Sequence, residues 1–272
     1  MIHKVRIGDI EVGGGALVLL AGPDVIESES SCFRHAEAIA KLADRFGLPF
    51  VFKCSYDKAN RTSMKGYRGP GLKRGLQILA KVKKKIGVPV LSDVHCVHQV
   101  KQAAEVLDCI QIPAYLCRQT DLLLAAGKTG RAINVKKGQF LAPWDMKPLI
   151  EKIESTGNKK ILLCERGTTF GYNMLVNDMR SLPIMRALGY PVVFDAGHST
   201  QLPGGLKNSS GGQAEFIPLL ARAAVGAGCD ALFVEVHEDP ARALCDGPSS
   251  LPLKELPSML RQLKAIREVV RG

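Results

Sequence analysis

Eight short, continuously apolar segments constrain the fold of this chain more than any other feature of its sequence. They are residues 17–21, 50–53, 90–93, 109–112, 132–135, 161–164, 192–194 and 231–235. A strand that is apolar at every position is buried on both faces, as in a parallel sheet covered by helices. Helical patterns separate the segments, so the sequence predicts an α/β fold, the (β/α)8 or TIM barrel. The 272 residues suit a single barrel domain over positions 1–272.

The helical patterns between these segments have recognisable ends. Residues 31–46 carry apolar side chains at helical spacing and are followed by Gly47, a residue typical of helix C-termini. Asp145 is a candidate N-cap for a helix that runs through Ile153, and residues 256–270 form a final amphipathic helix. The alternative is an open doubly wound sheet. Its dinucleotide fingerprint is not matched, because the glycines at 13–15 precede the first buried strand.

Two segments stand apart from the barrel pattern. Residues 5–7 and 10–12 flank Gly8-Asp9, a hairpin turn signal, so we expect residues 1–15 to form a β-hairpin across the bottom of the barrel. Residues 203–212 are rich in Gly and Ser and follow the seventh strand. This segment is either a flexible surface loop or an active-site lid, and its position favours the lid.

Charge and cysteine content narrow the classes of function. The formal net charge is +11, but beyond the run at 81–85 the basic residues are dispersed, which favours small anionic substrates over nucleic acid. The eight cysteines form no CxxC pair, which is typical of reduced thiols. The sequence shows neither a signal peptide nor a run that would span a membrane. We therefore expect a cytoplasmic protein.

Polar residues follow all eight predicted strands. In a barrel, the C-terminal ends of the strands face the active site. The strand-end set is Asp24, Lys53, Ser55, Lys58, Asn60, Arg61, Thr62, Asp93, His95, Gln111, Arg118, Lys136, Glu165, Arg166, Asp195, His198, Glu235, His237 and Asp246. Five of these residues are strand-end cations, enough to hold two phosphate-bearing substrates: Lys53, Lys58, Arg61, Lys136 and Arg166.

Five members of this set admit more than one interpretation. His198, Glu235 and Asp246 could ligate a divalent metal or form a hydrogen-bonded acid/base cluster, and spacing alone favours the cluster. Lys53 or Lys136 could form a Schiff base, but the neighbouring cations favour phosphate binding. No organic cofactor is expected.

Several segments resemble the 3-deoxy-D-manno-octulosonate 8-phosphate synthases, also called 2-dehydro-3-deoxyphosphooctonate aldolases. Lys58-Ala59-Asn60-Arg61-Thr62 resembles the KANRS motif of that family, and Thr62 keeps the hydroxyl of the usual Ser. Further matching segments are residues 111–114, 116–121, 134–141 and 164–172. The related heptulosonate synthases, which use erythrose 4-phosphate, carry Lys-Pro-Arg in place of this motif. They are the alternative function, and a sugar-phosphate sensor is a non-enzyme alternative.

The resemblance implies a transferase that condenses phosphoenolpyruvate with arabinose 5-phosphate and releases phosphate, for the lipopolysaccharide inner core of a Gram-negative-type bacterium. It also implies a homotetramer, in which Arg118 reaches a neighbouring site. We expect catalytic roles for His198, Lys58, Asp246 and Asp93. The expected substrate-binding residues are Lys53, Ser55, Lys58, Asn60, Arg61, Thr62, Gln111, Arg118, Lys136 and Arg166.

The chain departs from the family it resembles at one of the predicted metal ligands. One branch holds a divalent metal with Cys, His, Glu and Asp; the other has Asn at the Cys position and needs no metal. Here that position is Asp24. Residues 21–23 and 201–205 resemble the metal branch, and residues 245–248 resemble the metal-free branch. Three converging carboxylates would repel one another, so we expect Mn²⁺, Mg²⁺, Fe²⁺ or Zn²⁺ at Asp24, His198, Glu235 and Asp246.

Overall fold

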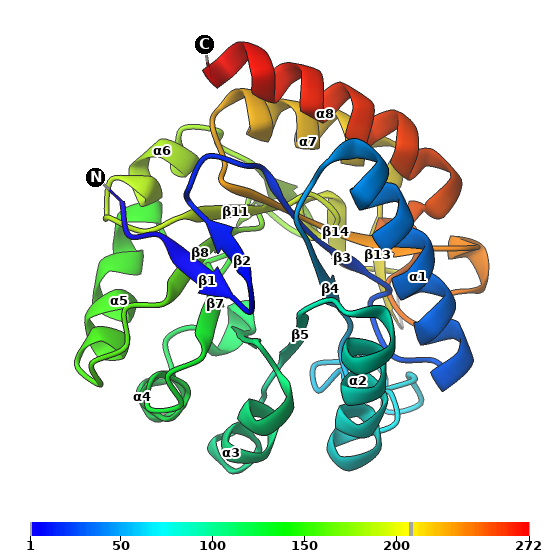
Figure 1. Ribbon diagram of the computed structural model, residues 1–272, viewed down its shortest axis with the longest axis horizontal. Coiled ribbons are helices and arrows are strands. Elements are labelled where there is room, and N and C mark those ends of the chain that lie inside the picture. The colour runs from blue at the N-terminus through cyan, green and yellow to red at the C-terminus, as the bar shows by residue number, and fades with distance from the viewer. Residues whose placement is uncertain (1, 207–208, 272) are drawn as a thin grey trace.

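The predicted strands form a closed parallel barrel (Figure 1). The computed structural model describes residues 2–206 and 209–271. In chain order the barrel strands are β3 (Val18–Gly22), β4 (Phe50–Lys53), β5 (Val90–Asp93), β6 (Cys109–Ile112), β7 (Ala132–Lys136), β8 (Ile161–Glu165), β11 (Val192–Asp195) and β14 (Ala231–His237). Strand β14 pairs in parallel with both β11 and β3, which closes the ring. The prediction of a (β/α)8 barrel is confirmed.

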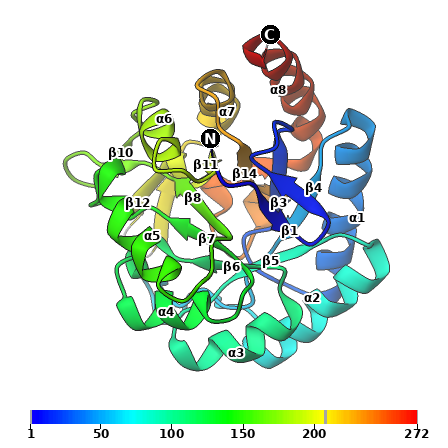
Figure 2. The ribbon, with the colours of Figure 1, turned by 60° about the vertical axis from the view of Figure 1, so that its left-hand side comes forward.

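Helices surround the barrel on its outside, as Figures 1 and 2 show. They are α1 (Glu29–Phe46), α2 (Leu72–Ile86), α3 (Val97–Val106), α4 (Thr120–Gly127), α5 (Lys147–Glu154), α6 (Ser181–Arg186), α7 (Ile217–Gly226) and α8 (Leu256–Arg271). Shorter strands lie outside the ring: β9 (Thr168–Thr169), β10 (Leu175–Val176), β12 (Gln201–Leu206), β13 (Ser209–Gly212) and β15 (Leu251–Pro252). None of the described helices is long and apolar enough to cross a membrane.

Each barrel strand contributes to two hydrophobic cores. One core lies between the strands and the surrounding helices and includes Leu19, Phe52 and Val90. The other fills the barrel interior and includes Leu20, Val51 and Phe233. Because successive side chains of a strand point to opposite faces, neighbouring apolar residues enter different cores. This arrangement explains why both faces of each strand carry apolar side chains.

An N-terminal hairpin covers one end of the barrel, as expected. Strands β1 (Val5–Ile7) and β2 (Ile10–Val12) pair in antiparallel register, and Figure 1 shows them in front of the barrel. The side chains of Val5, Ile7 and Val12 are fully buried and belong to the same cluster as the barrel interior. The hairpin therefore closes the barrel with apolar contacts at the N-terminal ends of the strands. The polar strand ends lie at the opposite end.

Two local predictions need revision. Asp145 does not begin α5: it lies in a 3-10 turn (Pro143–Met146), and its carboxylate accepts the Ala142 N–H at 3.3 Å. The α-helix starts only at Lys147 because this tighter turn comes first. Residues 203–212, predicted as a loop or lid, contribute to the antiparallel strands β12 and β13; Lys207 and Asn208 lie outside the described residues.

Two helical glycines provide a test of the packing between α2 and the barrel. A Cβ at Gly75 would lie 2.2 Å from Cβ of the fully buried Tyr56, whereas nothing lies within 4 Å of a Cβ at Gly226. We expect Gly75→Ala to lower the free energy of unfolding by about 1–3 kcal/mol, the usual cost of overpacking. Gly226→Ala should be neutral or stabilise by up to about 1 kcal/mol, because alanine favours helix. Urea unfolding midpoints measure both, and equal shifts would contradict the packing described here.

Candidate active site

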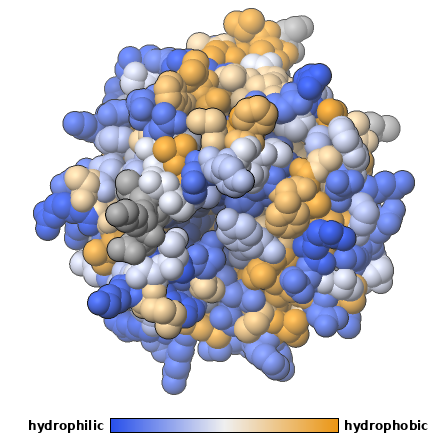
Figure 3. Space-filling model, turned by 180° about the vertical axis from the view of Figure 1, so that it is seen from behind, coloured by the Kyte–Doolittle hydropathy of each residue, from blue (hydrophilic) through white to orange (hydrophobic). Residues whose placement is uncertain are grey.

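A pocket of about 340 Å³ opens at the C-terminal end of the barrel strands. Figure 3 shows this face, opposite the hairpin, with a hollow near its centre. Most of the sequence-predicted site residues line the pocket: Lys58, Asn60, Arg61, Thr62, Asp93, Gln111, Lys136, Arg166, His198 and Asp246. Asp24, Lys53, Ser55 and Glu235 are buried and are not among the lining residues. The structure therefore gathers residues from 58 to 246 around one cavity.

Ion pairs organise the buried residues below the pocket. Lys53 is fully buried, and its Nζ lies 2.7 Å from Glu235 Oε1 and 3.0 Å from the backbone oxygen of Asp24. The Lys58 ammonium contacts Asp24 Oδ1. Lys53 and Lys136 also lie over the Phe233 ring, with Nζ 5.3 and 4.3 Å from its centroid. Each buried ammonium therefore has a carboxylate or a ring face beside it, which offsets the cost of desolvation.

Two carboxyl groups in this cluster have opposite pKa shifts. Burial favours the neutral form of Asp24, but the ammonium groups of Lys58 and Lys53 outweigh it and hold the Asp24 pKa well below its usual range. Burial and the neighbouring Asp24 carboxylate raise the Glu235 pKa well above its usual range. Asp24 therefore carries negative charge more readily than Glu235 does.

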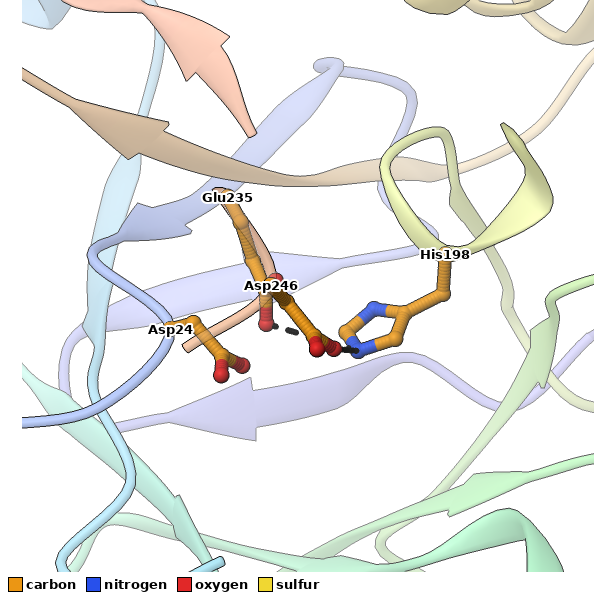
Figure 4. Close-up of side chains that lie close together, drawn as sticks. All are labelled: Asp24, His198, Glu235 and Asp246. Carbon is orange, nitrogen blue, oxygen red and sulfur yellow. Dashed lines mark ion pairs between the residues drawn. The ribbon is translucent and has the colours of Figure 1, made fainter. Parts of the chain in front are cut away.

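Four residues of the cluster could hold a divalent cation. One ligand atom from each of Asp24, His198, Glu235 and Asp246 lies within 4.8 Å of all the others (Figure 4). Among the described residues, Asp24 Oδ2 and Glu235 Oε2 are buried oxygens without a hydrogen-bond partner. Carboxylate oxygens with one imidazole are a donor set that suits first-row divalent ions and Mg²⁺. The residues present therefore fit the predicted metal site.

His198 is held in one orientation by Asp195. Its Nδ1 lies 2.8 Å from Asp195 Oδ2 and 3.3 Å from Lys136 Nζ, and Lys136 Nζ lies 2.6 Å from the same Asp195 oxygen. Burial lowers the His198 pKa to about 4, since the effect of Asp195 is smaller. The ring is therefore neutral near pH 7. Its Nε2 faces Glu235 Oε1 at 3.5 Å and Asp246 Oδ2 at 3.7 Å.

Two arginines at the pocket wall have donors available for an anion. Arg166 donates to Gln201 at 2.9 Å, and Gln201 in turn donates to Asp246 at 2.9 Å. Arg61 contacts Cys245 Sγ at 2.6 Å and lies 3.7 Å from Asp246 Oδ1. Within the described chain, Arg61 Nε and Arg166 Nη1 are buried without a hydrogen-bond partner. Such donors suit phosphate oxygens.

Asp93 connects a hydroxyl beneath the pocket to an imidazole on its wall. Ser55 donates to Asp93 Oδ1, and His95 Nε2 lies 2.9 Å from Asp93 Oδ2. Burial opposes charge on His95, but the hydrogen bond to Asp93 prevails and raises the His95 pKa. This arrangement presents a partly cationic ring to the pocket, beside Gln111, whose side chain is held by Asn134 at 3.0 Å.

One predicted residue lies elsewhere, and several lining residues escaped prediction. Arg118 is exposed and is not among the residues that line the pocket. Lining residues absent from the predicted set include Tyr115, Gln139, Gln201 and Cys245. Gln139 lies within the matched segment 134–141, which was a usable signal. Gln201 and Cys245 lie within the segments 201–205 and 245–248 that resemble the two family branches, but only their contacts with Arg166 and Arg61 show that their side chains reach the pocket.

Comparison with known proteins identifies the family of this chain. Over residues 2–271 the sequence matches the DAHP synthetase I family. A protein of Trichlorobacter lovleyi is 60% identical over 272 residues, covering 100% of both chains, and is named 2-dehydro-3-deoxyphosphooctonate aldolase. Proteins with the same name from Geotalea daltonii and Pelobacter propionicus are 60% and 61% identical, again over 100% of both chains. The chain therefore belongs to the DAHP synthetase I family, together with the 2-dehydro-3-deoxyphosphooctonate aldolases that it matches along its whole length.

Proposed function

We propose that the protein condenses phosphoenolpyruvate with arabinose 5-phosphate to give 3-deoxy-D-manno-octulosonate 8-phosphate and inorganic phosphate. The observation that carries this proposal is one pocket with two arginines, Arg61 and Arg166, that have unpartnered buried donors on either side of Asp246. Two phosphate-bearing substrates need two such sites close together. Three relatives about 60% identical along the whole chain carry the name of this enzyme.

The substrates are assigned to opposite sides of the pocket. Lys136 and Arg166 follow neighbouring strands, so we place phosphoenolpyruvate there, with Lys58 opposite. Asn60, Arg61 and Thr62 lie together in the loop after β4 and would hold the phosphate of the sugar. Fixed cations offset the repulsion between two anionic substrates and hold C3 of phosphoenolpyruvate near the aldehyde.

The chemistry needs charge stabilisation and proton transfer at two carbons. C3 of phosphoenolpyruvate bonds to the aldehyde carbon, whose oxygen takes up a proton, while water adds at C2 and phosphate leaves with the C2 oxygen. Lys58, whose pKa is raised despite burial because Asp24 adjoins it, is a fixed positive charge for the developing alkoxide. Neutral His198 presents Nε2 to the cluster, where it can ligate a cation or accept a proton.

We assign a divalent cation to Asp24, His198, Glu235 and Asp246, with Mn²⁺ or Mg²⁺ preferred because no thiolate is among the four ligands. When bound, it would supply Lewis-acid stabilisation of negative charge. The buried oxygens Asp24 Oδ2 and Glu235 Oε2, which have no hydrogen-bond partner among the described residues, support the assignment. The predicted lid also belongs to the site, because Pro203, Gly204 and Ser210 line the pocket.

We also propose that the protein acts in the cytoplasm as a homotetramer. Its eight cysteines are free thiols, which suits a reducing compartment. Large aromatic side chains are exposed in the segments that follow β6, β7 and β8: Tyr115, Phe140, Trp144, Phe170 and Tyr172. Exposed patches of this kind mark interfaces, and a neighbouring subunit would bring the exposed Arg118 into use.

The first prediction concerns the reaction. Purified protein should release phosphate from phosphoenolpyruvate when arabinose 5-phosphate is present and should not do so without an aldose. A coupled assay measures the rate of phosphate release, and erythrose 4-phosphate is tested in parallel as the alternative aldose. A higher kcat/KM with erythrose 4-phosphate than with arabinose 5-phosphate would contradict the proposed function.

The second prediction separates the two phosphate sites. Arg61→Ala should chiefly raise KM for arabinose 5-phosphate, and Arg166→Ala should chiefly raise KM for phosphoenolpyruvate. Loss of one charge-assisted contact costs roughly 1.5–3 kcal/mol, or about one to two decades in kcat/KM. Arg180→Ala is the control, since its exposed guanidinium pairs with Asp178 outside the pocket. Equal rises of both KM values in either variant would contradict the assignment.

The third prediction concerns the cation. Treatment with a chelator should lower activity, and Mn²⁺ or Mg²⁺ should restore it. Asp24→Asn should weaken Mn²⁺ binding, measured by electron paramagnetic resonance, by more than about tenfold, since even outer-shell changes cost metal sites about 10–100-fold. Asp178→Asn, an exposed carboxylate outside the pocket, is the control. Full activity in protein verified as free of metal would refute a catalytic role for the ion.

A further inference from the structure

Glu27 connects two loops that both carry active-site residues. It lies three positions after Asp24, in the segment between β3 and α1. Its Oε1 accepts the backbone N–H of Leu244 at 2.8 Å, across 217 positions of sequence. Leu244 directly precedes Cys245 and Asp246, both of which line the pocket. A single hydrogen bond thus joins the Asp24 loop to the Asp246 loop.

The second oxygen of Glu27 is held by a histidine. His237 Nε2 lies 3.4 Å from Glu27 Oε2, while His237 Nδ1 accepts the Asp239 N–H at 3.0 Å. Because Nδ1 is an acceptor, the proton of the neutral ring is on Nε2, directed at Glu27. Both carboxylate oxygens therefore have a partner from β14 or the loop that follows it, and these two contacts hold the carboxylate in place.

The backbone at Glu27 is attached to a third loop. Tyr67 donates its hydroxyl to the carbonyl oxygens of Ile26 at 3.0 Å and Glu27 at 3.3 Å. Tyr67 belongs to the loop after β4, in which the Arg68 carbonyl accepts the Lys58 N–H at 2.7 Å. The loops that carry Asp24, Lys58 and Asp246 consequently meet at one residue outside the pocket.

The segment that Glu27 holds has an unusual conformation and two functional contacts. Asp246 adopts a left-handed φ of 49°, which a non-glycine residue keeps only when its surroundings impose it. Cys245 contacts Arg61, and the Asp246 carboxylate belongs to the acidic cluster. Glu27 is neither a lining residue of the pocket nor a member of that cluster.

We propose that Glu27 is a positioning residue: its hydrogen bond to Leu244 N–H sets the 244–246 segment so that Cys245 meets Arg61 and Asp246 meets the acidic cluster. The kinetic part of this proposal rests on the proposed function, because Arg61 is assigned to the sugar phosphate. The structural part concerns only the hydrogen bond from the Leu244 N–H to Glu27 Oε1. The two parts can be tested in the same proteins.

Three variants test the proposal. Glu27→Ala removes the oxygen that accepts the Leu244 N–H. Glu27→Asp keeps the carboxylate charge on a shorter side chain. Glu27→Gln keeps the side-chain length and one oxygen that can accept the Leu244 N–H. Glu238→Gln is the matched control, since Glu238 lies in the loop that carries Leu244 but its exposed side chain pairs with Arg34. Circular dichroism and thermal unfolding check that each variant folds.

Hydrogen exchange at the Leu244 amide is the readout that needs no substrate. We expect exchange to accelerate by about tenfold or more in Glu27→Ala and Glu27→Asp, to stay near wild type in Glu27→Gln, and to be unchanged in the control. Unchanged exchange in Glu27→Asp would overturn the proposal whether or not Glu27→Ala folds.

Steady-state kinetics give the functional readout. Glu27→Ala and Glu27→Asp should raise KM for arabinose 5-phosphate by about fivefold or more, with KM for phosphoenolpyruvate within about twofold of wild type and Glu27→Gln restoring most of the loss. Equal rises in both KM values, or no rescue by Glu27→Gln, would contradict the positioning role. An inactive wild-type protein would instead count against the proposed function, and the exchange measurement would still decide the role of Glu27.

Discussion

Charge buried at the end of a closed barrel must be neutralised locally, and this requirement determines the rest of the site. Lys53 and Glu235 have no exposed surface, so neither would be tolerated without the other. The neighbouring carboxylate and ammonium of Asp24 and Lys58 follow the same rule. Local compensation of this kind keeps Asp24 and Lys58 charged, whereas burial leaves His198 neutral. The charge states of these side chains therefore result from the way in which the buried charges are paired.

The two ends of the barrel differ in polarity and in how far they are filled. The hairpin end is filled by Val5, Ile7 and Val12, which exclude water from the interior. The other end presents polar groups that must remain accessible to anions, so its loops need to be held in place without filling the cavity. Contacts behind the pocket wall, such as that of Glu27 with Leu244, meet this need because they fix backbone and leave the lining side chains free. Rigidity and access are thus provided by different residues.

Much of this architecture could be predicted from sequence, for identifiable reasons. Burial on both faces produced apolar runs that located every barrel strand, and the barrel rule placed Arg61, His198 and Asp246 at one end. The start of α5 was missed because a 3-10 turn takes up Asp145. Lys136 and Lys137 are adjacent and alike in sequence, yet Lys136 lines the pocket while Lys137 is fully buried against the Leu141 carbonyl. The pleat of the strand and the turn after it decide which lysine reaches the pocket. Amino-acid composition predicts neither the pleat nor the turn.

The seam between β3 and β14 has a consequence for synthesis of the chain on the ribosome. These strands pair from Val18 with Ala231 to Gly22 with Glu235, so the ring closes only after the eighth strand has emerged. The cluster of Asp24, His198, Glu235 and Asp246 straddles this seam, with Asp24 on one side and Glu235 on the other. In a nascent chain these residues therefore remain far apart until the eighth strand pairs, and long-range closure of this kind comes late in folding. A product truncated before β14 would contain most of the lysines and arginines that line the pocket but would lack the assembled cluster.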